Sequence, residues 1–198
     1  MKKTTITLAL LTFTVLAFMS CKSTKQKEPA YADDPRAKIV GTEGVLRPEW
    51  MNGTKKSGDL YYVVGDGRMG MSKSAQQGTA RTDALAKLAQ WKNAVVADTM
   101  KNYIDESGIP GNTQTLIRFE QATIARSTAN LTGFNQAEYW IDQDGIYHGL
   151  YSYPKNDLKK DFEASFSEFQ RNEAAAFADF KSQEAFKYLE AQLDKADR

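Results

Sequence analysis

The stretch EYWIDQDGIYHGLYSYP, residues 138–154, has the pattern of a β-hairpin. Aromatic and β-branched residues, which favour strands, are frequent in both of its halves. Asp144-Gly145 between the halves is a strong signal for a tight turn. Pro154 ends the second strand, because proline has no backbone N–H to donate. The stretch therefore predicts two antiparallel strands, near 134–141 and 146–153.

A third strand and a long helix are predicted upstream of the hairpin. Residues 60–64, LYYVV, have strand composition. A helix is expected to begin after a cap at Ser72 or Ser74 and to continue to about Ile104, before glycine and proline at 108–111. Its apolar stripe at three- and four-residue steps consists of Ala84, Leu88, Trp91, Val95 and Thr99. Small residues in its first turns would let it lie close to a sheet, and these are Ala75, Gly78 and Ala80.

A second helix is expected over about 113–131, with Ile117, Ile124 and Thr128 on its apolar face. Extended structure is expected to begin near Val45, and Asn52-Gly53 is a turn signal. The order strand, long helix, helix, hairpin, helix is an α+β pattern. We therefore expect a small antiparallel sheet packed on a long helix in a domain over residues 41–156, followed by a helical segment over 157–198.

The segment 157–198 has a helical composition and one apolar stripe whose register shifts near Ser182, which predicts a break or kink. The stripe consists of Phe162, Phe166, Phe169, Phe177, Phe180, Phe186, Leu189 and Leu193. Our hypothesis is that this amphipathic element packs outward on a partner or a second copy, because exposed stripes often mark interaction sites. The alternative is that it folds back and completes the core of its own domain, which also requires one apolar face.

Residues 65–70, GDGRMG, match the GxGxxG pattern between a predicted strand and a predicted helix. In a dinucleotide site, such glycines form the turn and admit the pyrophosphate. That unit also needs a second parallel strand within about 30 residues, ending in an acidic residue. Here a helix occupies that distance, so we interpret the loop as a turn where backbone passes close to backbone and expect no dinucleotide to bind.

Polar residues of the hairpin give weaker signals. His148 is the only histidine and has no accompanying Ser or Cys nucleophile motif, so a structural or solvated role is expected. Asp142 and Asp144 resemble the start of a calcium loop, but Ile146 occupies the next ligand position, and a turn role is favoured. Glu138 and Asp142 share a strand without any mark of an acid–base pair. We predict no catalytic, cofactor or metal site.

The N-terminal segment has the pattern of a secretion signal. Lys2 and Lys3 precede an uncharged, largely apolar run from Thr4 to Met19, which is shorter than a typical membrane-spanning helix. The following Ala17-Phe18-Met19-Ser20-Cys21 resembles a bacterial lipobox, with Phe18 in place of the usual leucine. This motif implies cleavage between Ser20 and Cys21 and lipidation of Cys21 with S-diacylglycerol and an N-acyl chain. The alternative is a plain cleaved signal or an uncleaved anchor.

We therefore predict a signal peptide over 1–20 and a lipidated, flexible tether over 21–40, which is rich in Lys, Ser, Thr, Pro and Asp. Under the sorting rule of enteric bacteria, Lys22 after the lipidated cysteine indicates the outer membrane. The predicted location is the bacterial cell envelope, with the membrane as partner through covalent lipid.

Composition excludes several classes of protein. One cysteine cannot form an intramolecular disulfide, and one histidine cannot build a usual zinc site. The formal net charge of +1 gives no strong field over the whole surface, so no nucleic-acid partner is expected. The chain of 198 residues is long enough for one domain with a core of useful size.

Several short motifs together resemble the LPP-twenty family of bacterial lipoproteins, which includes the twenty-kilodalton membrane-associated lipoprotein antigen and flagellar basal-disk lipoproteins. The motifs are Arg47-Pro48-Glu49-Trp50, Tyr61-Tyr62-Val63-Val64-Gly65, Ala75, Ala80-Arg81, Ala84, Leu85-Ala86-Lys87-Leu88, Glu138-Tyr139-Trp140-Ile141-Asp142 and Asp144-Gly145-Ile146-Tyr147. They cover roughly residues 45–155. The resemblance implies an envelope protein without established catalysis and a dodecin-like βαββ module; the phenylalanine-rich tail is outside the pattern.

Three classes of function remain open at this point. A non-enzymatic, lipid-anchored envelope protein with a structural, assembly or interaction role is favoured, as a homo-oligomer or with an envelope partner. A periplasm-facing ligand-binding module is the first alternative. A nucleotide-binding enzyme comes third, because no acid–base constellation accompanies the glycine-rich loop.

Overall fold

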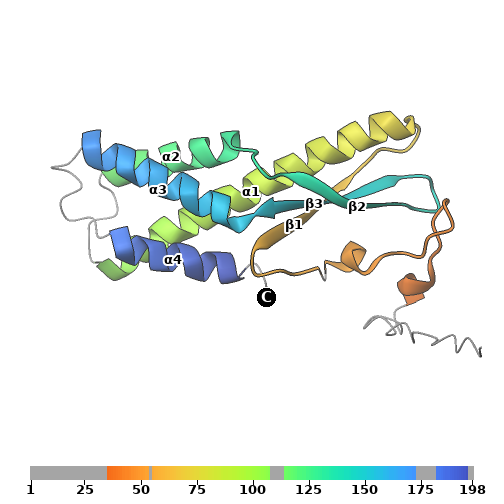
Figure 1. Cartoon of the computed structure of the whole chain (residues 1–198), viewed down its shortest axis with the longest axis horizontal. Helices are drawn as coiled ribbons and strands as arrows, with labels where there is room; N and C mark the ends of the chain where they lie inside the picture. Colours follow the sequence, from red (N-terminus) through yellow and green to blue (C-terminus); the bar gives the residue numbers. More distant parts are fainter. Residues whose placement is uncertain (1–34, 54, 108–113, 173–181, 196–198) are drawn as a thin grey trace, which may run out of the picture.

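In the computed structural model, which describes residues 35–53, 55–107, 114–172 and 182–195, four α-helices are combined with a three-stranded antiparallel sheet (Figure 1). The elements are the 3-10 helices η1 (Pro35–Lys38) and η2 (Glu49–Asn52), the strands β1 (Leu60–Asp66), β2 (Asn135–Ile141) and β3 (Tyr147–Pro154), and the helices α1 (Lys73–Ser107), α2 (Gln114–Ala129), α3 (Lys155–Asn172) and α4 (Ser182–Lys195). The predicted α+β class is confirmed, with element ends within a few residues of those expected.

The strand order is β1-β3-β2, so the second strand of the hairpin is central. Its register pairs Val63 with Tyr151 on one side and Trp140 with His148 on the other. The predicted hairpin turn is present: the Asp142 N–H donates to the Ile146 carbonyl, and Gly145 takes the left-handed conformation with φ of 75°. A glycine there avoids the clash that a Cβ would cause at positive φ.

Helix α1 extends along the whole molecule and joins the sheet at one end to the helices α2, α3 and α4 at the other. Its first half covers β1 and β3, and its second half packs against α2 and α4 (Figure 1). Contact with the sheet is tight at Gly65, where an added Cβ would lie 1.9 Å from the Ala80 carbonyl oxygen. Ala80 is fully buried as expected, but Ala75 is exposed and Gly78 faces open space, so only one of the three predicted small residues makes this contact.

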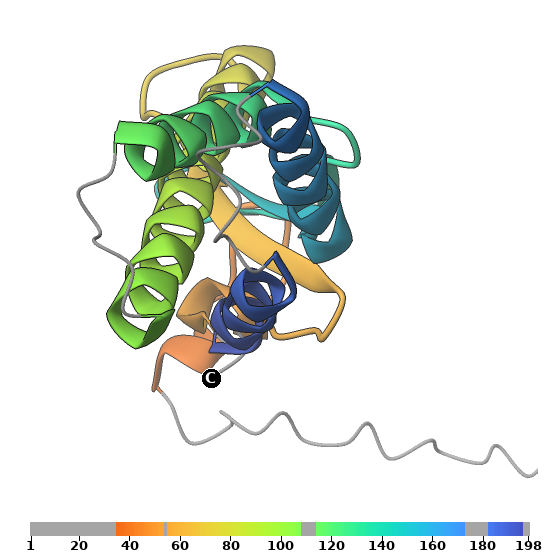
Figure 2. The ribbon, with the colours of Figure 1, turned by 90° about the vertical axis from the view of Figure 1, so that its left-hand side faces the viewer.

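The helical end of the molecule contains most of the main core. Figure 2 views this end: α2 (green) and α3 (dark blue) lie at the top, α1 (yellow-green) runs down the left, and α4 (blue) lies below. Edge-to-face contacts of Phe162 with Phe119 and Phe186 join α3 to α2 and α4. The core residues of the helices include Leu88, Val95, Val96, Met100, Tyr103, Leu116, Phe119, Leu158, Phe162, Ala185, Leu189 and Leu193.

The C-terminal stripe therefore folds back into the domain, and the hypothesis of outward packing is wrong for its described members. Helix α3 begins at Lys155, and its buried face packs in the same core as the sheet and the other helices, so the segments predicted over 41–156 and 157–198 meet in one core. Phe177 and Phe180 lie outside the described residues. The predicted break near Ser182 coincides with the first residue of α4.

The buried face of α2 also differs from the prediction. Leu116, Phe119, Thr123 and Ser127 are buried, whereas Ile117 is 43% exposed and Ile124 and Thr128 are half-buried. The buried positions lie one step back along the helix. The reason is tertiary: the large ring of Phe119 fits between Phe162 and Phe169 of α3, and this contact fixes the rotation of α2.

Residues 39–52, which precede β1, cover the opposite face of the sheet. Trp50 packs with Trp140 and Leu150, and Ile39 lies against this second cluster. Val40 and Leu46 form an antiparallel bridge, which confirms extended structure near Val45. Ile39, at the end of the predicted tether over 21–40, packs against this cluster, whereas η1 has no buried residue.

No helix within the described ranges is long and apolar enough to cross a membrane.

Candidate functional site

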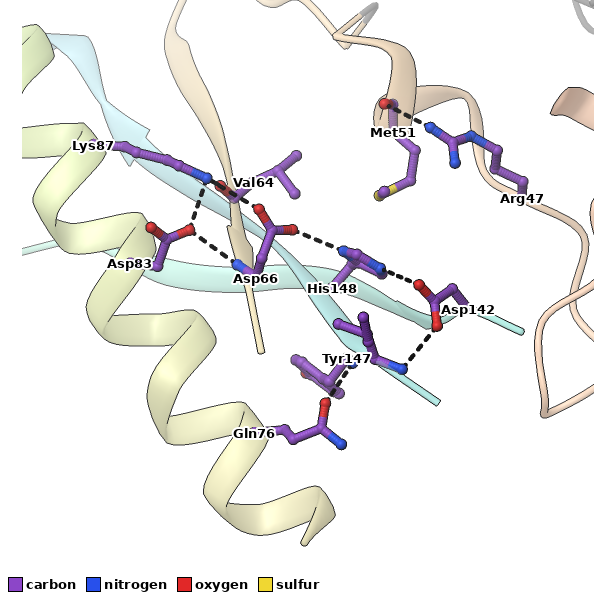
Figure 3. A network of polar contacts seen from close by, with 11 residues as sticks. Arg47, Met51, Val64, Asp66, Gln76, Asp83, Lys87, Asp142, Tyr147 and His148 are labelled. Carbon is purple, nitrogen blue, oxygen red and sulfur yellow. Dashed lines mark hydrogen bonds and ion pairs between the residues drawn. The ribbon is translucent and has the colours of Figure 1, made fainter. Parts of the chain in front are cut away.

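Five charged or titratable side chains form a continuous network across one end of the sheet (Figure 3). These residues, the clasp network, are Asp66, Asp83, Lys87, Asp142 and His148. Asp66 is the last residue of β1 and pairs in register with His148 on β3. Asp142 lies at the start of the β2–β3 turn, and Asp83 and Lys87 are one turn apart on α1. The network therefore ties all three strands to the long helix.

His148 is the centre of the clasp network. Its Nδ1 lies 2.7 Å from Asp66 Oδ1, and its Nε2 lies 3.1 Å from Asp142 Oδ2. The ring stacks on Trp140, and its side chain is only 12% exposed. Burial alone would lower the pKa of His148, but the hydrogen bonds and charges of Asp66 and Asp142 outweigh it and raise the pKa above its ordinary value of 6.5. In the imidazolium form both ring N–H groups donate to carboxylates.

Lys87 and Asp83 extend the network to the outer edge of β1, the edge that faces away from β3. Lys87 Nζ donates to the Val64 carbonyl at 2.9 Å and pairs with Asp83 at 2.7 Å and with Asp66 at 3.2 Å. The Asp66 N–H donates to Asp83 Oδ2 at 3.0 Å. The His148 hydrogen bond is the main cause that lowers the pKa of Asp66. Two side chains of α1 thus occupy backbone groups that an unprotected edge strand would offer to another chain.

The geometry of the network favours a structural role over chemistry. Both nitrogens of His148 point at carboxylates, so neither nitrogen is directed at open space for a substrate or a metal (Figure 3). Within the described ranges, no group of three or more His, Cys, Asp and Glu side chains is placed to hold a metal ion. The structural role predicted for His148 agrees with this placement.

Asp142 and Glu138, which the sequence singled out on one strand, have separate sets of partners. Asp142 Oδ1 accepts the N–H groups of Asp144 and Ile146, so this carboxylate shapes the turn as predicted. Glu138 accepts a hydrogen bond from Trp50 Nε1 at 2.9 Å and pairs with Lys55, not with Asp142. Ser20 and Cys21 lie outside the described residues.

The glycine-rich loop 65–70 brings backbone close to backbone. Besides the contact of Gly65 with α1, an added Cβ on Gly67 would lie 2.8 Å from Gln76 Oε1 and 3.1 Å from the Tyr147 carbonyl oxygen. The neighbour of β1 in the sheet is β3, and it runs antiparallel to β1. A dinucleotide site needs a parallel βαβ unit at this place, so the topology here is a different one. The interpretation as a packing turn is supported.

Two buried polar residues were missed by reasoning from the sequence. Gln76 joins the start of α1 to the hairpin: its Oε1 accepts from the Tyr147 N–H at 2.8 Å, and its Nε2 donates to the Gly145 carbonyl at 3.0 Å. Lys92 is fully buried and donates to the carbonyls of Ser127 and Asn130 at the end of α2, both at 2.7 Å. Burial lowers the pKa of Lys92 to about 8. Both side chains satisfy backbone groups that would otherwise be unpaired.

Comparison with known proteins found no match among family models, curated proteins or solved structures. The resemblance to the LPP-twenty family stays a prediction based on the motifs quoted above.

The clasp network predicts a specific dependence of stability on pH. The raised pKa of His148 means that the folded chain holds this proton more tightly than the unfolded chain. Its contribution is therefore full below pH 6.5 and is lost as the pH rises through the folded-state pKa. The lowered pKa of Asp66 has the opposite sign: its contribution is present above pH 3.8 and is lost as the pH falls through the lowered value.

We expect His148→Gln to lower the free energy of unfolding by about 1–2 kcal/mol near pH 6, since hydrogen bonds to charged groups carry such values and Asp66 is partly exposed. The loss should shrink as the pH is raised above 6.5. Urea titrations at several pH values measure it, with Asp66→Asn and the double variant completing a mutant cycle. A loss that stays constant from pH 6 to 9, or additive effects in the cycle, would contradict the coupling.

Proposed function

We propose that this chain is a lipid-anchored lipoprotein of the bacterial cell envelope with a non-catalytic structural, assembly or interaction role. The observation that carries the proposal is the order of basic residues, uncharged apolar run and Ala17-Phe18-Met19-Ser20-Cys21 at the N-terminus. Cys21 is the only cysteine, and it lies at the position where this type of signal requires one.

In the proposed maturation, the Cys21 thiol displaces the phosphorylated headgroup of a phospholipid, so that a thioether to diacylglycerol forms and the headgroup phosphate leaves. Signal peptidase II then hydrolyses the bond between Ser20 and Cys21. The freed α-amino group of Cys21 takes an acyl chain from a second phospholipid, which leaves as the lysophospholipid. Each buried methylene contributes roughly 0.8 kcal/mol to membrane attachment, so several acyl chains anchor a protein stably where one short chain would not. The positive Lys22 favours sorting to the outer membrane under the enteric rule.

A non-catalytic role is supported by how the polar residues are used. The carboxylates around His148 hold both of its nitrogens, and the loop 65–70 packs against α1 and β3. The resemblance of residues 45–155 to the LPP-twenty family agrees with an envelope role and with a dodecin-like module. The partner is proposed to be an envelope protein or a second copy, in addition to the membrane.

Cys21→Ser is expected to abolish lipidation and leave the chain unprocessed or detached from the membrane, because serine has no thiol to accept diacylglycerol. Incorporation of labelled fatty acid in a bacterial host measures this directly. Ser20→Gly is the matched control, since it keeps a small residue before the cysteine and should be labelled like the wild type. Equal labelling of Cys21→Ser and the wild type would rule out Cys21 as the lipidation site.

A further inference from the structure

Exposed apolar side chains gather at the end of the molecule opposite the helical core. Of the eight large hydrophobic side chains that are exposed in the described ranges, five lie in two short segments of this end. They are Val40, Val45, Leu46, Met69 and Met71. The first three belong to the N-terminal hairpin 39–47, and the methionines belong to the loop between β1 and α1. In Figure 1 both segments lie at the right-hand end, and together we call them the tip.

The two segments of the tip are fastened to one another and to the sheet. Glu43 in the hairpin pairs with Lys73 at the start of α1 at 2.6 Å. The Thr42 N–H donates to the Ile141 carbonyl at 3.2 Å, and Trp140 Nε1 donates to the Val45 carbonyl at 3.0 Å. Gly41 packs so closely on the sheet that an added Cβ would lie 1.9 Å from the Ile141 oxygen. The apolar side chains are thus presented on a fixed backbone.

One apolar side chain of the hairpin packs on the domain, and three others are exposed. Ile39 packs against the cluster of Trp50, Trp140 and Leu150. Val40 and Leu46, which are paired across the hairpin, are 43% and 58% exposed, and Val45 is 54% exposed. One exposed aliphatic residue would be ordinary, but three on one short hairpin form a cluster of the kind that marks an interaction site.

The position of Cys21 identifies the bilayer as the surface that meets the tip. Thirteen residues separate Cys21 from Pro35, where η1 begins, and this length spans at most about 50 Å. η1 directly precedes the hairpin, so an anchor on Cys21 is joined to the fold at the tip and keeps this end within about 50 Å of the membrane. A short tether raises the effective concentration of its target to roughly millimolar, so a small apolar contact is sufficient.

The tip contains one acidic residue, Glu43, and two basic ones, Arg47 and Arg68, so its formal charge is only +1 beside five exposed apolar side chains. Glu43 is paired with Lys73 at the start of α1, and the Arg47 guanidinium lies over the Trp140 ring. An apolar contact is therefore favoured over an electrostatic one. A contact of this kind should persist at high salt, unlike attraction of a basic patch to anionic lipid.

We propose that the tip lies on the bilayer, with Val40, Val45 and Leu46 at the boundary between headgroups and acyl chains. The proposal rests on the lipid anchor at Cys21. Helix α1, whose 35 residues extend over about 52 Å, then carries α2, α3 and α4 away from the membrane toward the periplasm. The helical end is thereby the part of the molecule that is displayed to envelope partners.

The test uses the mature, lipidated chain in vesicles of phosphatidylethanolamine and phosphatidylglycerol. Leu46→Cys and Ile117→Cys are each labelled with an environment-sensitive fluorophore; both positions are exposed and apolar, but Ile117 lies on α2. Mass spectrometry first establishes that Cys21 carries lipid. We expect the label at 46 to shift to shorter emission wavelength, to be quenched by spin-labelled lipid, and to resist iodide, at low and high salt. The label at 117 should show none of these effects.

Each other outcome overturns the proposal in a distinct way. A lipidated, vesicle-bound chain whose label at 46 is open to iodide shows an anchored protein without tip contact. Protection from iodide without quenching by lipid, together with disulfide cross-linking between two Leu46→Cys chains, assigns the tip to a second copy. Absence of lipid on Cys21 removes the anchor itself, and the proposed function fails with it.

A second variant combines Leu46→Glu with a label on Val45→Cys. It should keep lipidation and vesicle attachment, while the label at residue 45 loses its quenching by spin-labelled lipid.

Discussion

Phe162→Ala is expected to lower the free energy of unfolding by about 3–5 kcal/mol, the range for removing a buried aromatic ring. Phe162 is fully buried on α3, and its ring contacts Phe119 of α2 and Phe186 of α4. Its removal leaves a cavity where three helices meet, and rigid helices close such a cavity only partly. Urea denaturation followed by circular dichroism measures the loss.

The matched control for this variant is Ile117→Ala on the neighbouring α2. Ile117 is apolar too, but it is exposed, so its truncation should change the stability by no more than about 0.5 kcal/mol. If the two variants were equally mild, the C-terminal stripe would not be part of the core. The outward arrangement of that segment would then again be the better description.

Gly65→Ala is expected to destabilise the chain by about 3 kcal/mol, at the upper end of the range for overpacking a tight site. The new Cβ would lie 1.9 Å from the Ala80 carbonyl oxygen and 2.8 Å from the Ala84 Cβ. The first of these neighbours is backbone, so relief requires α1 to move away from β1. That movement would also disturb the pairing of Lys87 with Asp66, because this pair joins the same two elements.

Gly78→Ala is the control for Gly65→Ala, and it should have the opposite sign. Gly78 lies inside α1, and an added Cβ there meets nothing within 4 Å. Alanine in a helix interior is favoured over glycine by up to about 1 kcal/mol, so this variant should be more stable than the wild type. Thermal unfolding of both variants gives the comparison. A Gly65→Ala variant as stable as the wild type would show that α1 does not approach the sheet at this point.

Local patterns in the sequence were sufficient to predict the elements of the fold. The hairpin around Asp144-Gly145, the strand at 60–64 and the stripe on α1 are each encoded within a short window. The buried face of α2 was not, because its helix carries apolar residues on more than one side. Its rotation is set by Phe162 and Phe169, which are distant in the sequence.

The clasp network illustrates why the site was only partly predictable. A structural or solvated role was expected for His148 and a turn role for Asp142, whereas Asp66 belonged to a glycine-rich loop that was interpreted only as a packing turn. Its true partner lies 82 residues away in the chain, and the pairing depends on the register of β1 against β3. The four-residue spacing of Asp83 and Lys87 was the one local signal available, and it gave no indication that both would reach a strand edge.

We propose that the mature chain begins at a lipidated Cys21. Intact mass spectrometry of the protein purified from bacterial membranes tests it most directly. We predict a mass equal to residues 21–198 plus a diacylglycerol and one further acyl chain, with a blocked N-terminus. A chain that starts at another residue, or that carries a free thiol on Cys21, would contradict the account.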